Sequence, residues 1–443
     1  MEKIICSIID GEKIHPKETL TVDKSSFDFL RLFLKYGIID IIKLIKKIKN
    51  KSMKNFLLAV LCVSGGALLV FCLTIIQPSL LGLSASTWFT FHGGMDRAGF
   101  SPDLSPANNA IAWTYNLPQI GNQKGVILGS PAIASGKVIF GALDGKVHAL
   151  DLKTGKELWT FKGQKSFGKS SPTVTGDKVV IGGQDKFIYA LDLNSGKQAW
   201  RYLTDNMVNG SPAVLGDQVF AGSEGGYFYA LNLQTGKLNW REKLGDKISD
   251  SPAVYKNKIY VSVDTSTENK FEVFCLNPKD GSDYWSYETD TNTKLASPML
   301  ANNLVYTGGT DGKIYGIRAS DGVVAWSKEA GDEFNDAPAY AYDRVYGLNA
   351  NGEAVALGKD DGHIFWRYKT GAPAEASPII ADKKICFGNQ AGNFYCLDRA
   401  GALIWKKKLA GQITAAASSG NGLIIVVSHT DKDSAVTAFG KYK

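Results

Sequence analysis

The residues of this 443-residue chain that could do chemistry are few and scattered. The stretch Gly163–Ser170 fits the phosphate-loop expression G-x-x-x-x-G-K-[ST]. A working phosphate loop lies between a strand and a helix, because the backbone amides at the helix N-terminus face the phosphates. Here the stretch runs directly into Ser171-Pro172 with no helical pattern after it. We therefore interpret it as a connecting loop.

The histidines and acidic residues form no catalytic or metal-binding motif in the sequence. The five histidines stand far apart, at positions 15, 92, 148, 363 and 429. There is no HExxH, no Cys-x-x-Cys and no G-x-S-x-G, so neither a zinc centre nor a serine hydrolase is indicated. Glu288–Asn292 resembles the start of a calcium loop but lacks its glycine and distal glutamate. We predict no catalytic residue and no metal site.

A recurring sequence unit makes up most of the chain and must position any binding residues. The segment Ala149–Trp159 returns as Ala190–Trp200 and as Ala230–Trp240, and weaker copies end at four later tryptophans. A Ser-Pro pair, replaced once by Ala-Pro, stands before each copy, and successive prolines are about 40 residues apart. A fixed period of this length predicts a repeat architecture.

Each repeat consists of four runs of strand length. In the first repeat these runs are 131–134, 137–141, 146–150 and 157–161. They are rich in β-forming residues and are bounded by turn pairs such as Asp144-Gly145, where glycine accepts the positive φ of a tight hairpin. No helical periodicity appears from Trp113 onward. Four short antiparallel strands per repeat are typical of a propeller blade.

The number of repeats predicts how the ring closes. Seven repeats are complete between Ser130 and Leu409, and an eighth reaches Phe439 without its tryptophan-bearing strand. The missing strand is available at 110–115, and pairing it with the last repeat would remove an exposed sheet edge. We predict that residues 87–443 form one all-β domain. It is an eight-bladed β-propeller of four-stranded antiparallel blades, with the last blade closed by the N-terminal strand.

The repeat pattern Ala-x-Asp-x-x-Thr-Gly-Lys-x-x-Trp resembles that of the pyrroloquinoline quinone (PQQ)-like β-propeller family. The resemblance extends from Trp88 to the C-terminus, and Trp88–Gly99 resembles a lead-in common in that family. The family includes quinoprotein dehydrogenases and the propeller lipoprotein of the outer-membrane β-barrel assembly machinery. It implies that one tryptophan per blade packs against neighbouring backbone. These residues are Trp113, Trp159, Trp200, Trp240, Trp285, Trp326, Trp366 and Trp405.

The N-terminal region carries signals of a membrane anchor. Residues 1–54 are basic and in part amphipathic, which suits a cytoplasmic segment at a membrane surface. The uncharged apolar run 55–78 is long enough to span a bilayer as a transmembrane helix. Because lysines precede this run and none follows closely, the propeller is expected to face the periplasm or the cell exterior.

A second interpretation of the same residues remains open. If translation starts at Met53, residues 1–52 are not part of the protein. The apolar run would then be a signal peptide with small residues at 84–86 for cleavage. The run is longer than the usual signal-peptide core, which favours a retained signal anchor. Both interpretations export the propeller.

Charge argues against one class of partner. The chain has a formal net charge of +7, and residues 1–86 hold twelve Lys and Arg against seven Asp and Glu. The remainder is therefore close to neutral. A nucleic-acid-binding domain needs a basic face that displaces counterions, so we predict no nucleic-acid partner.

The cysteines do not form an obvious disulfide framework. Cys275, Cys386 and Cys396 all fall in predicted strands, and the last two flank one hairpin. A bridge between them is an alternative in an oxidising compartment. Because a disulfide requires a narrow geometry, we expect two free, buried thiols instead.

The residues just before each Ser-Pro pair differ between blades, whereas the scaffold positions stay similar. Repeat proteins vary the face that binds, so these residues predict a ligand-binding axial rim for a protein partner or a small ligand. In the quinoprotein relatives the cofactor lies over the channel mouth with calcium. The resemblance therefore implies that Asn209, Asn335, Asp336 and Glu375 are candidate oxygen ligands. The full set of predicted rim residues is Lys169, Asn209, Asp250, Asn335, Asp336 and Glu375.

Two functions fit these observations. The first is a membrane-anchored, non-enzymatic binding or scaffold protein without a cofactor, by analogy in envelope assembly. The second is a quinoprotein dehydrogenase that oxidises alcohols or sugars with PQQ and calcium. The chain has neither the adjacent cysteine pair of many family dehydrogenases nor their long inter-blade insertions. We therefore favour binding or scaffolding.

Overall fold

The computed structural model describes residues 88–443, except 104, 266–269 and 290–291. The predicted basic segment 1–54 and the predicted transmembrane helix 55–78 lie outside the described residues. Within the part of the chain that is described, no helix has the length and hydrophobicity needed to cross a bilayer.

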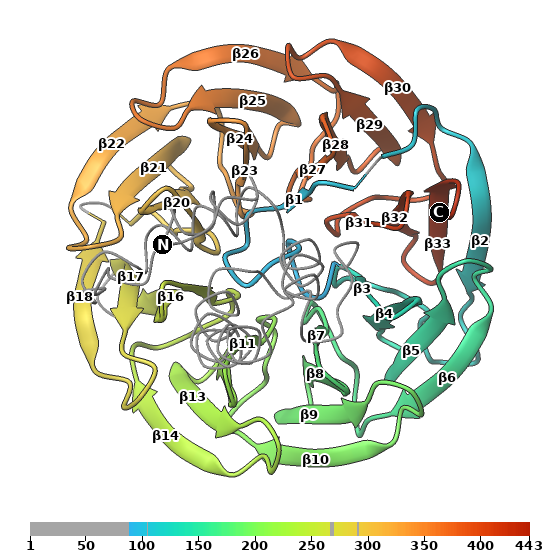
Figure 1. Ribbon diagram of the computed structural model, residues 1–443, viewed down its shortest axis with the longest axis horizontal. Helices are drawn as coiled ribbons and strands as arrows, with labels where there is room; N and C mark the ends of the chain where they lie inside the picture. The colour runs from blue at the N-terminus through green and yellow to red at the C-terminus, as the bar shows by residue number, and fades with distance from the viewer. Residues whose placement is uncertain (1–87, 104, 266–269, 290–291) are drawn as a thin grey trace, which may run out of the picture. The chain divides into compact units, whose positions relative to one another are not determined.

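Residues from Trp88 onward form eight sheets arranged in a ring around a common axis (Figure 1). Blade one contains β3 (Ala132–Ala134), β4 (Lys137–Gly141), β5 (Lys146–Asp151) and β6 (Glu157–Lys162). Blade two contains β7 (Thr173–Thr175), β8 (Lys178–Gly182), β9 (Phe187–Asp192) and β10 (Gln198–Leu203). Blade three contains β11 (Ala213–Leu215), β12 (Gln218–Gly222), β13 (Tyr227–Asn232) and β14 (Leu238–Lys243). Blade four contains β15 (Ala253–Tyr255), β16 (Lys258–Thr265), β17 (Lys270–Leu276) and β18 (Asp283–Glu288).

The second half of the ring repeats this order. Blade five contains β19 (Met299–Ala301), β20 (Leu304–Gly308), β21 (Lys313–Arg318) and β22 (Val324–Glu329). Blade six contains β23 (Ala339–Ala341), β24 (Arg344–Leu348), β25 (Glu353–Gly358) and β26 (Ile364–Lys369). Blade seven contains β27 (Ile379–Ala381), β28 (Lys384–Gly388), β29 (Asn393–Leu397) and β30 (Leu403–Lys408). Blade eight contains β31 (Ser418–Gly420), β32 (Leu423–His429), β33 (Ser434–Gly440) and β2 (Ile111–Leu117).

The core lies between blades rather than within any one of them. The inner and middle strands are mostly buried, whereas the outermost strand of a blade such as β6 is largely exposed. One apolar cluster joins Met299 and Tyr306 of blade five to Phe334 and Val345 of blade six. Each blade therefore buries its faces only against its neighbours, as in other repeat folds.

The ring closes by pairing the two ends of the domain, which confirms the predicted eight-bladed architecture. Strand β2 runs antiparallel to β33, and Trp113 lies opposite Ala438. One sheet departs from the predicted four strands, because β1 (Phe100–Ser101) adds to blade seven parallel to β27. The inner edge of β27 offers unpaired backbone groups, which the passing lead-in segment satisfies.

Seven of the eight repeat tryptophans dock on the following blade in the same way. The indole Nε1 of Trp200, for example, donates to Leu233 O at 2.8 Å. The ring covers Gly236, which has φ +68°, and a Cβ there would lie 2.6 Å from the ring. Glycine is therefore required both by the backbone conformation and by the close approach of the ring.

Trp405 is the exception. Its ring packs against Phe439, with centroids 5.6 Å apart, and its Nε1 has no hydrogen-bond partner among the described residues. The docking glycine lies in the turn between the third and fourth strands of the next blade. In blade eight these two strands come from opposite ends of the domain, so no such turn exists.

The prediction of two free thiols in blade seven is wrong. Cys386 and Cys396 form a disulfide, and Cys275 is the free, buried cysteine among the described residues. The two bridged residues face each other directly in the β28–β29 pairing, with Cα atoms 4.2 Å apart. Direct cross-strand register, which depends on the turn between the strands, brings the two sulfur atoms together.

The two docking modes predict different costs for the same substitution. Trp200→Phe removes a buried hydrogen bond and leaves Leu233 O without its donor, so it should cost about 1 kcal/mol more than Trp405→Phe. Trp200→Ala should cost about 3–5 kcal/mol, as for other buried aromatic residues. Urea unfolding of the purified protein measures all three changes. Equal costs for the two Phe variants would show that the indole hydrogen bonds do not stabilise the ring.

Candidate functional site

The lead-in segment Trp88–Ser101 crosses the centre of the ring (Figure 1). Its backbone bonds to the innermost strands, or to the residues beside them, of six blades. The partners of Trp88, Phe89, Met95, Asp96, Ala98 and Gly99 are Ile133, Val174, Val254, Leu300, Tyr340 and Ile380, in that order. The segment therefore ties together blades that are far apart in sequence.

Arg97 is the anchor of this segment and is fully buried. Its guanidinium donates to the carbonyl oxygens of Phe91, Ser211, Pro212 and Pro252 at 2.8–3.2 Å, and also to Thr90 Oγ1. Burial lowers the pKa of Arg97 to about 9. A buried charge is costly unless its donors are satisfied, and here carbonyl dipoles supply the partners.

His92 is a structural residue at the same place. Its ring nitrogens lie 2.9 Å from Arg97 O and 3.0 Å from Pro378 O. Burial lowers its pKa to about 4, so the imidazole is neutral at physiological pH. It links the lead-in segment to blade seven and is not a candidate acid or base.

The serines of the Ser-Pro pairs form a hydrogen-bonded belt around the axis. In each step, the backbone amide of one serine donates to the hydroxyl of the serine in the next blade, at 2.8–3.0 Å. The belt runs through Ser130, Ser171, Ser211, Ser251 and Ser297. It stops at blade six, where alanine occupies the equivalent position. This belt explains the Ser-Pro marker in the sequence.

A cavity of about 510 Å³ lies on the axis, and Phe91 of the lead-in segment contributes to its lining. All six predicted rim residues line it, so the structure brings together Lys169, Asn209, Asp250, Asn335, Asp336 and Glu375. The sequence reasoning missed Lys294, Ser297, Ser377 and His429, which also line the cavity. Lys294 stands three residues before a Ser-Pro serine, so comparing that offset across the repeats would have found it.

Asn209 belongs to a cluster around Glu224 at the edge of the cavity. Its Nδ2 donates to Glu224 Oε1 at 3.0 Å, and Lys247 Nζ lies 2.9 Å from Oε2. Ser249 Oγ also donates to Oε1, at 2.8 Å. Burial acts to raise the pKa of Glu224, but these three donors together hold it below its ordinary value. The Glu224 carboxylate is therefore satisfied within the cluster, whereas Asn209 Oδ1 has no hydrogen-bond partner among the described residues.

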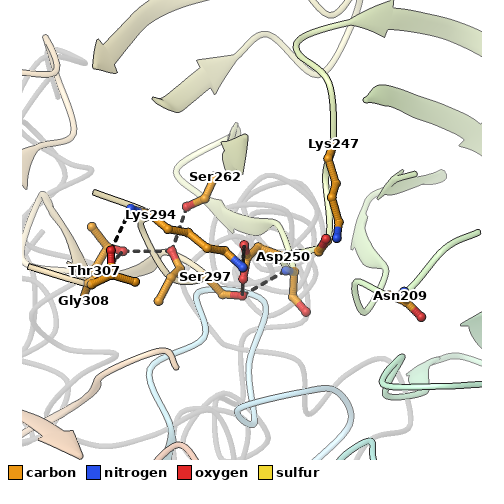
Figure 2. A network of polar contacts seen from close by, with 12 residues as sticks. Asn209, Lys247, Asp250, Ser262, Lys294, Ser297, Thr307 and Gly308 are labelled. Atoms are coloured by element: carbon orange, nitrogen blue, oxygen red, sulfur yellow. Dashed lines mark hydrogen bonds and ion pairs between the residues drawn. The ribbon is translucent and has the colours of Figure 1, made fainter. Parts of the chain in front are cut away.

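Asp250 is satisfied by residues of the next blade (Figure 2). Ser297 Oγ donates to Asp250 Oδ1 at 3.1 Å, and Lys294 Nζ lies 4.0 Å from Oδ2. Burial raises the pKa of Asp250, and Lys294 opposes that rise. Behind this pair, Ser262 and Thr307 both donate to Ala296 O, which fixes the backbone beside Ser297.

Asp336 has a different environment from Asp250. Its carboxylate makes no hydrogen bond or ion pair with any described residue. The pKa of Asp336 is raised to about 7, chiefly by burial. The nearby carboxylates of Asp250 and Glu375 contribute to the rise, and Lys169 and Lys294 oppose it. Asp336 therefore exchanges its proton near neutral pH.

The donor set does not fit the calcium ion implied by the quinoprotein resemblance. Calcium takes six to eight oxygen ligands, usually with several carboxylates. The cavity carboxylates come singly from three blades, and the described residues contain no group of three His, Cys, Asp or Glu that could hold a metal. One candidate ligand is already partly engaged, since Glu375 Oε1 accepts from Gln390 Nε2 at 2.8 Å.

A ring of blades joined by tryptophans docked on glycine turns defines the class of PQQ-like repeat propellers. The sequence model of the family described as outer membrane protein assembly factor BamB matches residues 103–264 and 269–438. The chain belongs to that family, which confirms the resemblance drawn from its repeats.

Individual relatives match only parts of the chain. BamB of Yersinia pestis is 26% identical over 167 residues, or 34% of this chain and 42% of that protein. Tetrathionate hydrolase of Acidithiobacillus ferrooxidans is 26% identical over 166 residues, or 32% and 33%. Quinohemoprotein alcohol dehydrogenase of Comamonas testosteroni is 38% identical over 100 residues, or 20% and 12%. The chain thus matches less than half the length of each relative.

The solved structure of the Comamonas testosteroni enzyme has the same fold. It superposes with a TM-score of 0.69 at 15% identity and covers 83% of each chain. At this level of identity the similarity shows the shared propeller and leaves the activity of this chain to other observations.

The raised pKa of Asp336 predicts how stability depends on pH. The folded state holds the proton up to about pH 7, whereas the unfolded carboxyl loses it near its ordinary value of 3.8. Stability is therefore lost as the pH rises from about 4 to about 7. Asp336→Asn removes this penalty and should raise the free energy of unfolding at pH 8 by about 1–2 kcal/mol, with little change at pH 4.

Chemical unfolding at both pH values measures this difference. Asp217→Asn, in an exposed turn outside the cavity, is the matched control and should behave like the native protein at both pH values. A variant at Asp336 that is equally stable, or less stable, at pH 8 would contradict the assignment of a desolvated carboxyl.

Proposed function

We propose that this chain is a non-enzymatic propeller outside the cytoplasm that binds or scaffolds other proteins during assembly of the outer membrane. The family match carries this proposal, because it extends over nearly the whole ring, from residue 103 to residue 438. The relatives named BamB are outer membrane protein assembly factors. We extend that role to this chain.

The disulfide of blade seven supports export. Disulfides such as Cys386–Cys396 persist in oxidising compartments and are rare where thiols are kept reduced. We further propose that residues 55–78 attach the chain to the membrane, either as a retained anchor or until cleavage as a signal peptide. The propeller then faces the periplasm or the cell exterior, where a protein partner can reach the rim.

The axial rim supplies the chemistry for such binding. Residues before the Ser-Pro pairs bring amide, carboxylate and ammonium groups from separate blades to one cavity mouth. Charges at an interface determine which partner is accepted and how fast it associates, more than they add affinity. A rim of mixed charge on a rigid ring therefore suits selective docking of a protein partner.

Loss of the chain should impair outer-membrane assembly. In cells that produce this protein and have an outer membrane, deleting its gene should lower the abundance of outer-membrane β-barrel proteins about twofold or more. Quantitative proteomics of isolated outer membranes measures the change. Re-expression of the native chain should restore these levels, and re-expression with Cys386→Ser and Cys396→Ser tests the disulfide separately. Unchanged barrel-protein levels in the deletion strain would contradict the assembly role.

A PQQ- and calcium-dependent dehydrogenase is the second candidate, which the local identity to the Comamonas testosteroni enzyme favours. We expect it to fail, because the cavity residues do not form a calcium ligand set. The test mixes the purified protein with PQQ and calcium chloride, then records the melting temperature and the quinone absorbance retained after gel filtration. Stoichiometric retention with a raised melting temperature would establish quinone binding and favour the dehydrogenase.

A further inference from the structure

Blades four and six carry a carboxylate at the same position of the repeat. Asp250 and Asp336 each stand directly before the Ser-Pro or Ala-Pro pair that leads into the innermost strand. The other six blades have glycine, serine or alanine at this position. Both aspartates line the axial cavity, and each has a following blade that can offer it partners.

The chain itself supplies the partners of Asp250. The following blade contributes the hydroxyl of Ser297, which donates to Asp250 at 3.1 Å. It also contributes the ammonium group of Lys294, 4.0 Å from the same carboxylate (Figure 2). One hydrogen bond from a serine hydroxyl and one nearby ammonium charge therefore stabilise the carboxylate of blade four.

The equivalent residues beside Asp336 provide only half of this arrangement. Blade seven has Ser377 at the position of Ser297, but Ala374 at the position of Lys294. A methyl group provides no charge and no donor. Asp336 makes no hydrogen bond or ion pair with a described residue. Ser377 is 2% exposed, and its hydroxyl has no hydrogen-bond partner in the described part of the chain.

We propose that the axial cavity binds a small organic cation whose primary ammonium group pairs with Asp336 and Ser377. This ammonium group would take the place that Lys294 of blade five takes beside Asp250 of blade four. The charges of the lining agree with a cationic ligand, since three carboxylates face two ammonium groups there. A burial-raised pKa at Asp336 is also expected of a carboxyl that awaits a counter-charge. A cavity of about 510 Å³ has room for a ligand body, and its serine and asparagine side chains suit hydroxyl groups on that body.

This inference goes beyond the assembly role, because it assigns a ligand to the cavity. The same chemistry could come from a free amine or from a lysine side chain of a docked protein. Two pairs of probes separate these sources: glucosamine with glucose, and the peptide Gly-Lys-Gly with its Nε-acetylated form. The peptide is capped as an N-terminal acetyl and a C-terminal amide in both forms, so that the lysine Nε is its one amine. Within each pair, one probe carries a primary ammonium group and the other has none.

Isothermal titration of the purified full-length chain is the first measurement. At least one ammonium probe should bind about tenfold more tightly than its neutral counterpart, since a paired buried charge contributes at least this much. Preference for glucosamine indicates a free amine, and preference for the peptide alone indicates a partner's lysine. If neither ammonium probe binds better than its neutral counterpart, the proposal is wrong.

Two substitutions test the position of the site. Asp336→Asn removes the counter-charge, and Ala374→Lys gives blade seven the lysine that blade five already has. Each should weaken binding of the ammonium probe about tenfold or more. Asp217→Asn, outside the cavity, should leave the affinity unchanged. Melting temperatures establish that each variant is folded. If the Ala374→Lys variant does not fold, the affinity of the Asp336→Asn variant alone tests the position of the site. Unchanged affinity in a folded Asp336→Asn protein would overturn the assignment.

Discussion

The buried guanidinium of Arg97 is the interaction on which the centre of this propeller depends. A charge at the axis of an apolar ring is tolerated only because backbone carbonyls from blades three and four and from the lead-in segment surround it. Those carbonyls belong to the Ser-Pro segments that lead into the innermost strands of the two blades. The lead-in segment therefore fixes the positions of the inner strands, and through them the floor of the cavity.

The ring was predictable from the sequence because its determinants are local and repeated. Hairpin turns, strand lengths and the period of the tryptophans each depend on residues close together in the chain. The crossing of the axis by Trp88–Ser101 was not predictable, since its partners lie as far away in sequence as Ile380, which bonds to Gly99, and are backbone atoms without a sequence signature. The disulfide was missed for a related reason. Whether Cys386 faces Cys396 depends on strand register, and a shift of one residue would send the two side chains to opposite faces.

The candidate site was predictable in part. The variable residues before the Ser-Pro pairs line one cavity, because equivalent positions of a closed ring converge on its axis. Their individual roles depend on contacts between blades that no single repeat contains. Asn209 is held by Glu224 and Asp250 by Ser297, whereas Asp336 has no such partner. Residue type alone grouped these three together, and only the geometry separates a satisfied polar group from an available one.

The similarity of the eight blades makes the difference between Asp250 and Asp336 informative. In an isolated site, an unpartnered carboxylate has no reference for what its partner should be. Here blade five provides the reference, because the same backbone positions hold Lys294 and Ser297 around Asp250. The belt of serine hydrogen bonds also ends beside Asp336, at Ala337, so blade six differs from blade four at the residue that follows the shared aspartate. A ring of similar blades gains a specific binding position by losing partners at one blade while the remaining blades keep the scaffold rigid. Asp336 meets this condition more fully than any other described residue of the rim.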